Sequence, residues 1–250
     1  MCGIVGYIGS KQAAPFLLDG MSKLEYRGYD SAGIAVLEKG QVRVEKCVGR
    51  LDALRQKLEG NMPESVIGIG HTRWATHGRP SDRNSHPHTD GSGKFVVVHN
   101  GIIENYLALK EELIAKGVEF SSDTDTEVVA HLMADLFDGD MESTVKKVLK
   151  VIKGSYSLVF MCEAEQDKII CTKKDNPLVI GLGEGENFIA SDIPAIINHT
   201  RRTFIMSDGE IATVTKDGVW VQDIEGTPIN KKVFEVNWNA EAAEKGGFEH

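Results

Sequence analysis

Cys2 is the residue of this chain best suited to nucleophilic chemistry. Removal of Met1 would leave its thiol and a free α-amine attached to one carbon. The thiol can attack an electrophilic carbon, and the amine, whose pKa is ordinarily about 7.7–8.0, can accept the proton of the thiol. The alternative is an ordinary small apolar residue near the end of the chain. Cys2 alone leaves both interpretations open.

Three polar segments carry further residues suited to chemistry. The first, residues 26–33, has the sequence YRGYDSAG, and its glycines permit a tight loop. Its Arg27 and Asp30 can form an ion pair or hold the start of the chain in place. A surface turn closed by a salt bridge explains the same residues equally well.

The second polar segment, residues 70–79, places Arg73 and Trp74 side by side between hydroxyl and imidazole side chains. An arginine can pair with a carboxylate through two parallel hydrogen bonds, and a tryptophan can shield that pair from water. The segment therefore suits the binding of a small zwitterion in a pocket. A polar loop anchored by one tryptophan is the alternative.

The third polar segment, residues 98–105, follows an apolar run with Asn100 and Gly101. A side-chain amide and a backbone N–H that point at one place form an oxyanion hole, which stabilises the negative charge of a tetrahedral intermediate. Asn-Gly is also among the commonest turn sequences, so a plain turn is the alternative.

Residues 121–127, SSDTDTE, precede an apolar run with helical periodicity. Ser, Thr and Asp side chains commonly cap the start of a helix. We expect Thr124 or Asp125 to be the cap, with Glu127 completing a capping box if Thr124 is the cap. Asp125 can instead face the amine of a ligand.

Several histidines invite a metal interpretation, among them the pair His86 and His88. This pair lacks the helical spacing and the neighbouring cysteine or carboxylate set of a zinc site. Residues 181–185, GLGEG, have the glycines of a dinucleotide loop, but a strand-like run and not a helix follows them. We therefore expect neither a metal ion nor an organic cofactor. The histidines in question are His71, His77, His86 and His88.

Composition narrows the class of protein. The chain has 250 residues, 41% of them hydrophobic, which is enough for a full core, and a formal net charge of −9. This charge argues against a nucleic acid as the main partner. No apolar run is long enough to span a bilayer and no signal peptide is recognised, so no membrane partner is expected. The absence of a CxxC pair among the cysteines indicates reduced thiols and a cytoplasmic location. The cysteines are Cys2, Cys47, Cys162 and Cys171.

Strands and helices must position these segments, and they occur in blocks along the chain. Short apolar runs predict strands over residues 3–8, 31–37, 41–48, 66–71, 95–100, 156–162, 168–172, 178–183, 188–191, 204–206, 210–215 and 219–223. Helical periodicity predicts helices over residues 13–24, 51–58, 106–116, 126–137 and 141–151. Because strands and helices do not alternate regularly, we predict an α+β fold with mostly antiparallel sheets.

Five segments together resemble the N-terminal-nucleophile, or class II, glutamine amidotransferases: residues 2–6, 26–33, 71–78, 99–101 and 124–127. Residues 74–77 and 86–88 are most similar to the members that transfer ammonia to fructose 6-phosphate. The resemblance implies a glutaminase domain over residues 1–238, folded as a four-layer αββα sandwich of two antiparallel sheets between helices. Residues 239–250 are similar to the linker that leads into a sugar-isomerase region in those members, and that region is absent from this sequence.

The resemblance also implies a role for each candidate site residue. Cys2 is expected to attack the side-chain amide of glutamine, while Asn100 and Gly101 stabilise the oxyanion. The other residues are expected to bind the substrate or to position the terminus and its loops: Arg73 with Thr76 and His77 at the α-carboxylate, Asp125 at the α-ammonium, Trp74 over the pocket, Arg27 and the Gly28 backbone at the terminal amine, and Tyr29 where the site closes.

The implied function is hydrolysis of L-glutamine to glutamate and ammonia through a Cys2 thioester. In the complete enzyme the ammonia would pass to fructose 6-phosphate to make glucosamine 6-phosphate. The implied partners are glutamine and the missing isomerase region. The full-length enzyme is expected to be a homo-oligomer, whereas for the fragment a monomeric state is left open. Two alternatives are the glutaminase domain of another amidotransferase and, if Met1 is retained, a glutamine-binding module without catalysis.

Overall fold

The alternating side chains of strand β1 (Gly3–Ile8) determine how the molecule is layered. Ile4 and Ile8 on one face of β1 belong to a core that lies between two sheets. Val5 and Tyr7 on the other face belong to a second core, which lies against helices. A strand that is buried on both faces lies in the middle of a layered structure.

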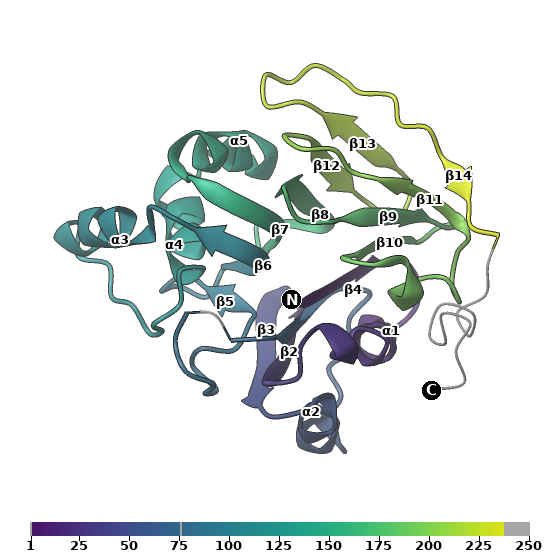
Figure 1. Cartoon of the computed structure of the whole chain (residues 1–250), viewed down its shortest axis with the longest axis horizontal. Helices are drawn as coiled ribbons and strands as arrows, with labels where there is room; N and C mark the ends of the chain where they lie inside the picture. The colour runs from purple at the N-terminus through teal and green to yellow at the C-terminus, as the bar shows by residue number, and fades with distance from the viewer. Residues whose placement is uncertain (1, 76, 238–250) are drawn as a thin grey trace.

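Two antiparallel sheets form the inner layers of the described structure, which comprises residues 2–75 and 77–237 of a computed structural model (Figure 1). The larger sheet has the order β14-β11-β9-β10-β1-β4-β2-β3, and the smaller sheet has the order β13-β12-β8-β7-β6-β5. After β1, the strands of the larger sheet are β2 (Ser31–Glu38), β3 (Gln41–Val48), β4 (Ile67–Arg73), β9 (Val179–Leu182), β10 (Asn187–Ala190), β11 (Arg202–Ile205) and β14 (Phe234–Glu235). Those of the smaller sheet are β5 (His88–Thr89), β6 (Phe95–Ile103), β7 (Gly154–Cys162), β8 (Glu165–Lys174), β12 (Ile211–Val214) and β13 (Val219–Gln222).

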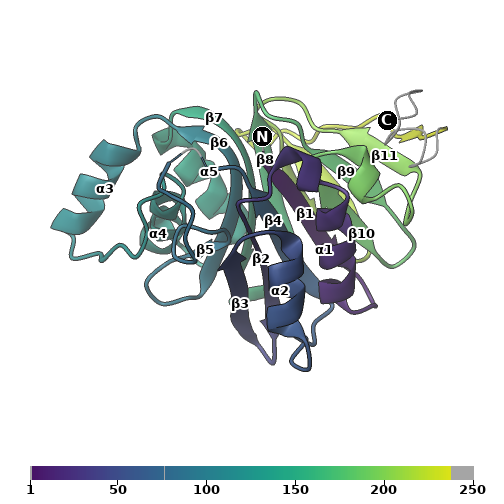
Figure 2. The ribbon, with the colours of Figure 1, turned by 60° about the horizontal axis from the view of Figure 1, so that its bottom comes forward.

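Helices cover the outer faces of both sheets, as the two views together show (Figures 1 and 2). Helices α1 and α2 pack on the larger sheet, α4 and α5 pack on the smaller sheet, and α3 packs on α4. The helices are α1 (Ala13–Ser22), α2 (Leu51–Leu58), α3 (Tyr106–Ala115), α4 (Glu127–Leu136) and α5 (Met141–Val151), with short 3₁₀ helices at Glu25–Arg27 and Ile193–Ala195. Within the described ranges, no helix is long and apolar enough to cross a membrane.

Three hydrophobic cores fill the spaces between the four layers. On β6, Val96 and Val98 face the core between the sheets, while Phe95 and Val97 face the core that lies under α4 and α5. The third core joins the larger sheet to α1 and α2. The predicted α+β sandwich with two antiparallel sheets between helical layers is therefore confirmed.

The predicted cap of α4 is wrong, although the predicted range 126–137 agrees with the observed one to within one residue at each end. This helix begins at Glu127 after Thr126, whose side chain makes no capping hydrogen bond, so neither Thr124 nor Asp125 is the cap. The Glu127 carboxylate accepts hydrogen bonds from the backbone N–H and hydroxyl groups of two preceding serines, Ser121 and Ser122. This carboxylate therefore fixes the loop before the helix and does not complete a capping box. The predicted linker over residues 239–250 lies outside the described residues.

Candidate active site

Three strand ends from the two sheets meet at one end of the core between the sheets. Cys2 directly precedes β1, Arg73 ends β4, and Asn100 lies near the end of β6. Because side chains alternate along a strand, each of these three residues lies on the strand face that points into the core between the sheets, as Ile4 does on β1. The sheet packing therefore brings a thiol, a guanidinium and an amide together from distant parts of the sequence.

Cys2 is held at its backbone and at its sulfur. Its carbonyl oxygen accepts hydrogen bonds from Arg27 Nε at 3.0 Å and from Asn100 Nδ2 at 3.0 Å. Its Sγ accepts a hydrogen bond from the backbone N–H of Trp74 at 3.2 Å. Burial raises the pKa of the Cys2 thiol, while the Trp74 backbone and the charges of Arg73 and Arg27 lower it. Burial has the larger effect, so the pKa of this thiol is raised, and the sulfur is held in a fixed position as a thiol that needs a base.

The segment formed by residues 26–33 holds the surroundings of Cys2. The buried Arg27 guanidinium pairs with the Asp192 carboxylate at 3.2 Å. Gly28 passes so close to the next segment that an added Cβ would lie 2.7 Å from the Trp74 backbone nitrogen, so only glycine fits here. Tyr29 packs edge-on against Trp74, with ring centroids 5.5 Å apart. These contacts place the start of the chain against the segment that follows β4.

Arg73 has one guanidinium nitrogen without a hydrogen-bond partner among the described residues. Its Nη2 donates to the backbone carbonyls of His77 and, at 2.9 Å, of Gly78. Its Nη1 is buried and has no hydrogen-bond partner among the described residues. Buried donors in native proteins nearly always have a partner. An anionic ligand such as a carboxylate supplies what this nitrogen lacks.

Asp125 contributes a buried carboxylate to the same pocket. Its Oδ2 accepts a hydrogen bond from the backbone N–H of Ile103 at 2.7 Å. The pocket encloses about 20 Å³, which is room for roughly one water molecule, so an amino acid can enter only after its walls move apart. The pocket is lined by Cys2, Arg73, Trp74, His77, His86, His99, Gly101, Thr124, Asp125 and Thr126.

Gly101 lines this pocket, and Asn100, which precedes it on β6, contacts the pocket residue Cys2. One hydrogen of Asn100 Nδ2 is used by the Cys2 carbonyl, and the second remains for another acceptor because an amide nitrogen carries two. Gly101 has a φ of +127°, and an added Cβ would lie 2.1 Å from the Ser155 carbonyl oxygen. Only glycine fits at this position.

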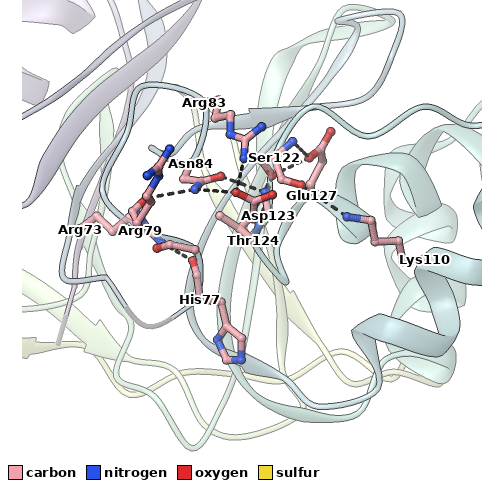
Figure 3. A network of polar contacts seen from close by, with 11 residues as sticks. Arg73, His77, Arg79, Arg83, Asn84, Lys110, Ser122, Asp123, Thr124 and Glu127 are labelled. Carbon is pink, nitrogen blue, oxygen red and sulfur yellow. Dashed lines mark hydrogen bonds and ion pairs between the residues drawn. The ribbon is translucent and has the colours of Figure 1, made fainter.

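A network of polar contacts connects the loop after β4 to the loop before α4 (Figure 3). Asn84 is fully buried and donates from Nδ2 to the Arg79 carbonyl at 3.0 Å and to the Asp123 carboxylate at 3.2 Å. Its Oδ1 accepts a hydrogen bond from the Asp123 backbone N–H at 2.9 Å. The exposed Arg83 pairs with the same carboxylate. The loops that carry Arg73's partners and Asp125 are therefore fastened to each other.

Buried histidines lie in and behind one wall of the pocket, which His86 and His99 line directly. His86 and His99 form hydrogen bonds with the Thr126 hydroxyl at 3.0 and 2.9 Å, and His88 forms one with the Thr124 hydroxyl at 3.1 Å. Burial lowers the pKa of all three histidines, which favours their neutral forms. Within residues 2–75 and 77–237, no group of three or more His, Cys, Asp or Glu side chains is arranged to hold a metal ion.

The structure brings the predicted site residues together, except for Thr76, which lies outside the described residues. Four residues that line the pocket were not predicted from the sequence: His86, His99, Thr124 and Thr126. His86 was considered only as a metal ligand, an interpretation that was rejected, and the two threonines only as part of a capping sequence. Another histidine beside the site, His71, could have been placed from strand alternation. His71 lies two residues before Arg73 on β4 and therefore on the same face.

Comparisons with known proteins agree with this geometry. The chain matches the family described as "Glutamine amidotransferase domain" over residues 71–198, which is more than half of its length. Over the whole chain it is 57% identical to glutamine–fructose-6-phosphate aminotransferase (isomerizing) of Caldanaerobacter subterraneus subsp. tengcongensis, 54% identical to that of Clostridium tetani and 52% identical to that of Aquifex aeolicus. The chain spans only 41–42% of the length of these relatives.

Solved structures show the same fold. The B. subtilis glutamine phosphoribosylpyrophosphate amidotransferase complexed with ADP and GMP aligns with a TM-score of 0.78 and 26% identity, over 89% of this chain and 49% of its own. A glutamine aminotransferase class-II domain protein from Silicibacter pomeroyi aligns with a TM-score of 0.61 and 14% identity, over 89% of this chain and 99% of its own, which is a likeness of fold alone. From the family match, the relatives and the shared fold, we conclude that this chain belongs to the family of glutamine amidotransferase domains.

Proposed function

We propose that this chain, once Met1 is removed, hydrolyses L-glutamine to glutamate and ammonia at Cys2. The observation that carries the proposal is a single pocket that holds Cys2, the buried Asp125 carboxylate, and Arg73 with a buried nitrogen that has no partner among the described residues. Arg73 binds the α-carboxylate and Asp125 binds the α-ammonium of an amino acid. A substrate held at both charges presents its side-chain amide to Cys2.

The chemistry follows from the groups around Cys2. The sulfur attacks the amide carbon of glutamine, and the α-amine of Cys2 takes the thiol proton and delivers it to the departing ammonia. The carbonyl oxygen becomes an oxyanion that accepts hydrogen bonds from the second Asn100 Nδ2 hydrogen and the Gly101 N–H. Collapse of this intermediate forms a thioester, which water then hydrolyses to release glutamate and restore the thiol.

The remaining predicted residues have positioning roles in this proposal. Thr76 and His77 assist Arg73 at the α-carboxylate, and the exposed Trp74 covers the pocket together with Tyr29. Arg27 and the Gly28 backbone hold the terminal residue. For Arg27, the supporting contact is the hydrogen bond to the Cys2 carbonyl, one bond from the carbon that carries the amine.

For the whole protein, we propose transfer of the ammonia to fructose 6-phosphate by a sugar-isomerase region outside this sequence. The support is the name shared by relatives that are 52–57% identical to this chain over its full length. An amidotransferase with a different acceptor is the second candidate, supported by the fold shared with the phosphoribosylpyrophosphate enzyme at 26% identity. The higher identity favours the sugar-phosphate acceptor. We also propose a cytoplasmic location, where a thiol nucleophile stays reduced, and a homo-oligomeric full-length enzyme.

A mass measurement paired with an activity assay tests the glutaminase. The intact mass should show loss of Met1, and the processed chain should release glutamate from glutamine and be alkylated once by an electrophilic glutamine analogue. Cys2→Ala should abolish both the turnover and the labelling because it removes the nucleophile, whereas Cys47→Ala at a second partly exposed thiol should retain them. Undiminished turnover in Cys2→Ala would refute the assignment of the nucleophile.

A further inference from the structure

His71 lies directly behind Asn100, in the space between the two sheets. Its side chain is almost completely buried near the end of β4. His71 Nε2 lies 3.0 Å from Asn100 Oδ1 and 3.0 Å from the His99 carbonyl oxygen. Both of these oxygens are acceptors, so Nε2 carries the hydrogen. His71 Nδ1 is then unprotonated, and it has no hydrogen-bond partner within the described ranges.

These contacts allow only one orientation of the Asn100 amide. With Oδ1 toward His71, the amide nitrogen faces Cys2 and donates to its carbonyl at 3.0 Å. A rotation of the amide by 180° would place the NH₂ group against the His71 N–H and the amide oxygen against the Cys2 carbonyl. That rotation would exchange two hydrogen bonds for a donor–donor and an acceptor–acceptor contact in a buried site.

His71 also stays uncharged at pH values near 7. Burial lowers its pKa to about 3, although the hydrogen bonds to Asn100 and His99 act in the opposite direction. The charge of Arg73 adds to the lowering, and the His86 ring lies 4.1 Å away between centroids. A neutral imidazole at this place is a fixed hydrogen-bond donor and not a proton carrier.

We propose that His71 is a positioning residue for catalysis, whose Nε2–H fixes the Asn100 amide with its nitrogen toward Cys2. This inference rests on the proposed glutaminase function. Through Asn100, His71 determines whether an N–H or an oxygen faces the carbonyl that becomes the oxyanion. An amide oxygen in that place would repel the oxyanion, so loss of His71 lowers turnover more than it weakens substrate binding.

Kinetics of matched variants test this role. His71→Leu removes the donor, while His71→Gln can place an amide N–H near the position of Nε2. Loss of one oxyanion donor costs about 10²–10³ in kcat, so misorientation of Asn100 in His71→Leu should cost about 10–10² in kcat, with KM changed less than about threefold. His71→Gln should recover most of this loss. His131→Leu, which removes an equally buried imidazole that contacts Glu127, controls for lost burial and should keep near-normal kcat.

A double-mutant cycle separates positioning from general structural support. In an Asn100→Ala background, His71→Leu should cause little further loss of kcat, because the group that it orients is absent. An equal loss in both backgrounds would overturn the proposal. So would a folded His71→Gln variant as slow as His71→Leu, or a loss that appears only in KM.

A measurement without turnover distinguishes this proposal from the proposed function. Long-range ¹H–¹⁵N NMR of the ligand-free chain should show His71 with its hydrogen on Nε2 between pH 6 and 8. A hydrogen on Nδ1 in a chain that hydrolyses glutamine would overturn the role of His71 and leave the glutaminase intact. A processed chain with the hydrogen on Nε2 but without glutaminase activity would overturn the proposed function and, with it, this role.

Discussion

Arg73 and Asp125 are each fixed by one atom of the charged group, which leaves the other atom for a ligand. The Nη2 of Arg73 is used by two backbone carbonyls, while Nη1 has no partner in the described part of the chain. Oδ2 of Asp125 accepts a hydrogen bond from the Ile103 backbone N–H at 2.7 Å, while Oδ1, among residues 2–75 and 77–237, has a single 3.5 Å contact with the Thr126 hydroxyl. The two groups are therefore already held in place for the two charges of an amino acid, although the pocket walls must move apart to admit it.

Arg73→Ala should therefore lower kcat/KM for glutamine by a factor that corresponds to about 2–5 kcal/mol of transition-state stabilisation, as expected when one partner of a buried charge pair is truncated. The matched substrate is 4-aminobutanamide, which keeps the amide and the ammonium and lacks the α-carboxylate. It should be poor for the unmodified chain and lose little more on mutation, because Arg73 has no carboxylate to bind. An equal loss for both substrates would make Arg73 a support of the loop and not a reader of the carboxylate.

Between elements, the loop after β4 and the loop before α4 behave as one unit because Asn84 joins them (Figure 3). Asn84 uses Oδ1 and Nδ2 to bind Arg79 and Asp123, which belong to the two different loops. The first loop supplies the carbonyls that hold Arg73, and the second supplies Asp125. The pocket of about 20 Å³ must open for a substrate, so this link between its walls bears on how tightly glutamine binds.

Asn84→Ala should raise KM for glutamine with a smaller change in kcat, because it loosens the binding residues and leaves Cys2 and Asn100 in place. It should also lower the free energy of unfolding by about 1–3 kcal/mol, since buried groups lose their hydrogen-bond partner. Arg83→Ala is the matched control: it removes an exposed ion pair to the same Asp123 carboxylate and should change both quantities little. Urea unfolding and steady-state kinetics of both variants measure this. Equal effects from the two substitutions would contradict a specific role for Asn84.

Elements and catalytic motifs could be predicted from local sequence, but contacts across the molecule could not. Short apolar runs predicted β1 and β3, and helical periodicity predicted α2 and α5, all four with their observed bounds. The cap of α4 was misassigned because the Glu127 carboxylate accepts hydrogen bonds from serines of the preceding loop and does not complete a capping box. The role of His71 depends on the way β4 faces β6 across the core, and no spacing along the chain reports that packing.

At the scale of the whole molecule, the layered architecture buries a group of histidines in their uncharged form. Burial lowers the pKa of His71 to about 3 and those of His86 and His88 well below 6.5. Nearby cations, Arg73 for all three and Lys46 for His88, lower them further, while Glu127 acts in the opposite direction on His88. The fold therefore excludes protons that the unfolded chain would bind.

Stability should consequently fall as the pH drops from 7.5 to 5.5. Each of the three histidines has a pKa of 6.5 when unfolded and a lower one when folded, so over this range the unfolded chain takes up protons that the folded chain does not. Each contributes a loss of at most about 1.4 kcal/mol, or about 4 kcal/mol together, and His99, whose pKa burial also lowers, adds to the loss in the same direction. Glu127, whose pKa is lowered by its hydrogen bonds, stays ionised in both states here and loses its contribution only below about pH 4.5.

Urea unfolding at the two pH values measures this loss, with the dependence on urea expected to stay the same because the surface exposed does not change. His86→Gln replaces one of the three imidazoles by a side chain that does not titrate. That variant should reduce the difference between pH 7.5 and 5.5 by about 1.4 kcal/mol, whatever it does to the stability at pH 7.5. A free energy of unfolding that is the same at both pH values would mean that these histidines are protonated in the folded molecule, and the buried neutral cluster beside the pocket would have to be abandoned.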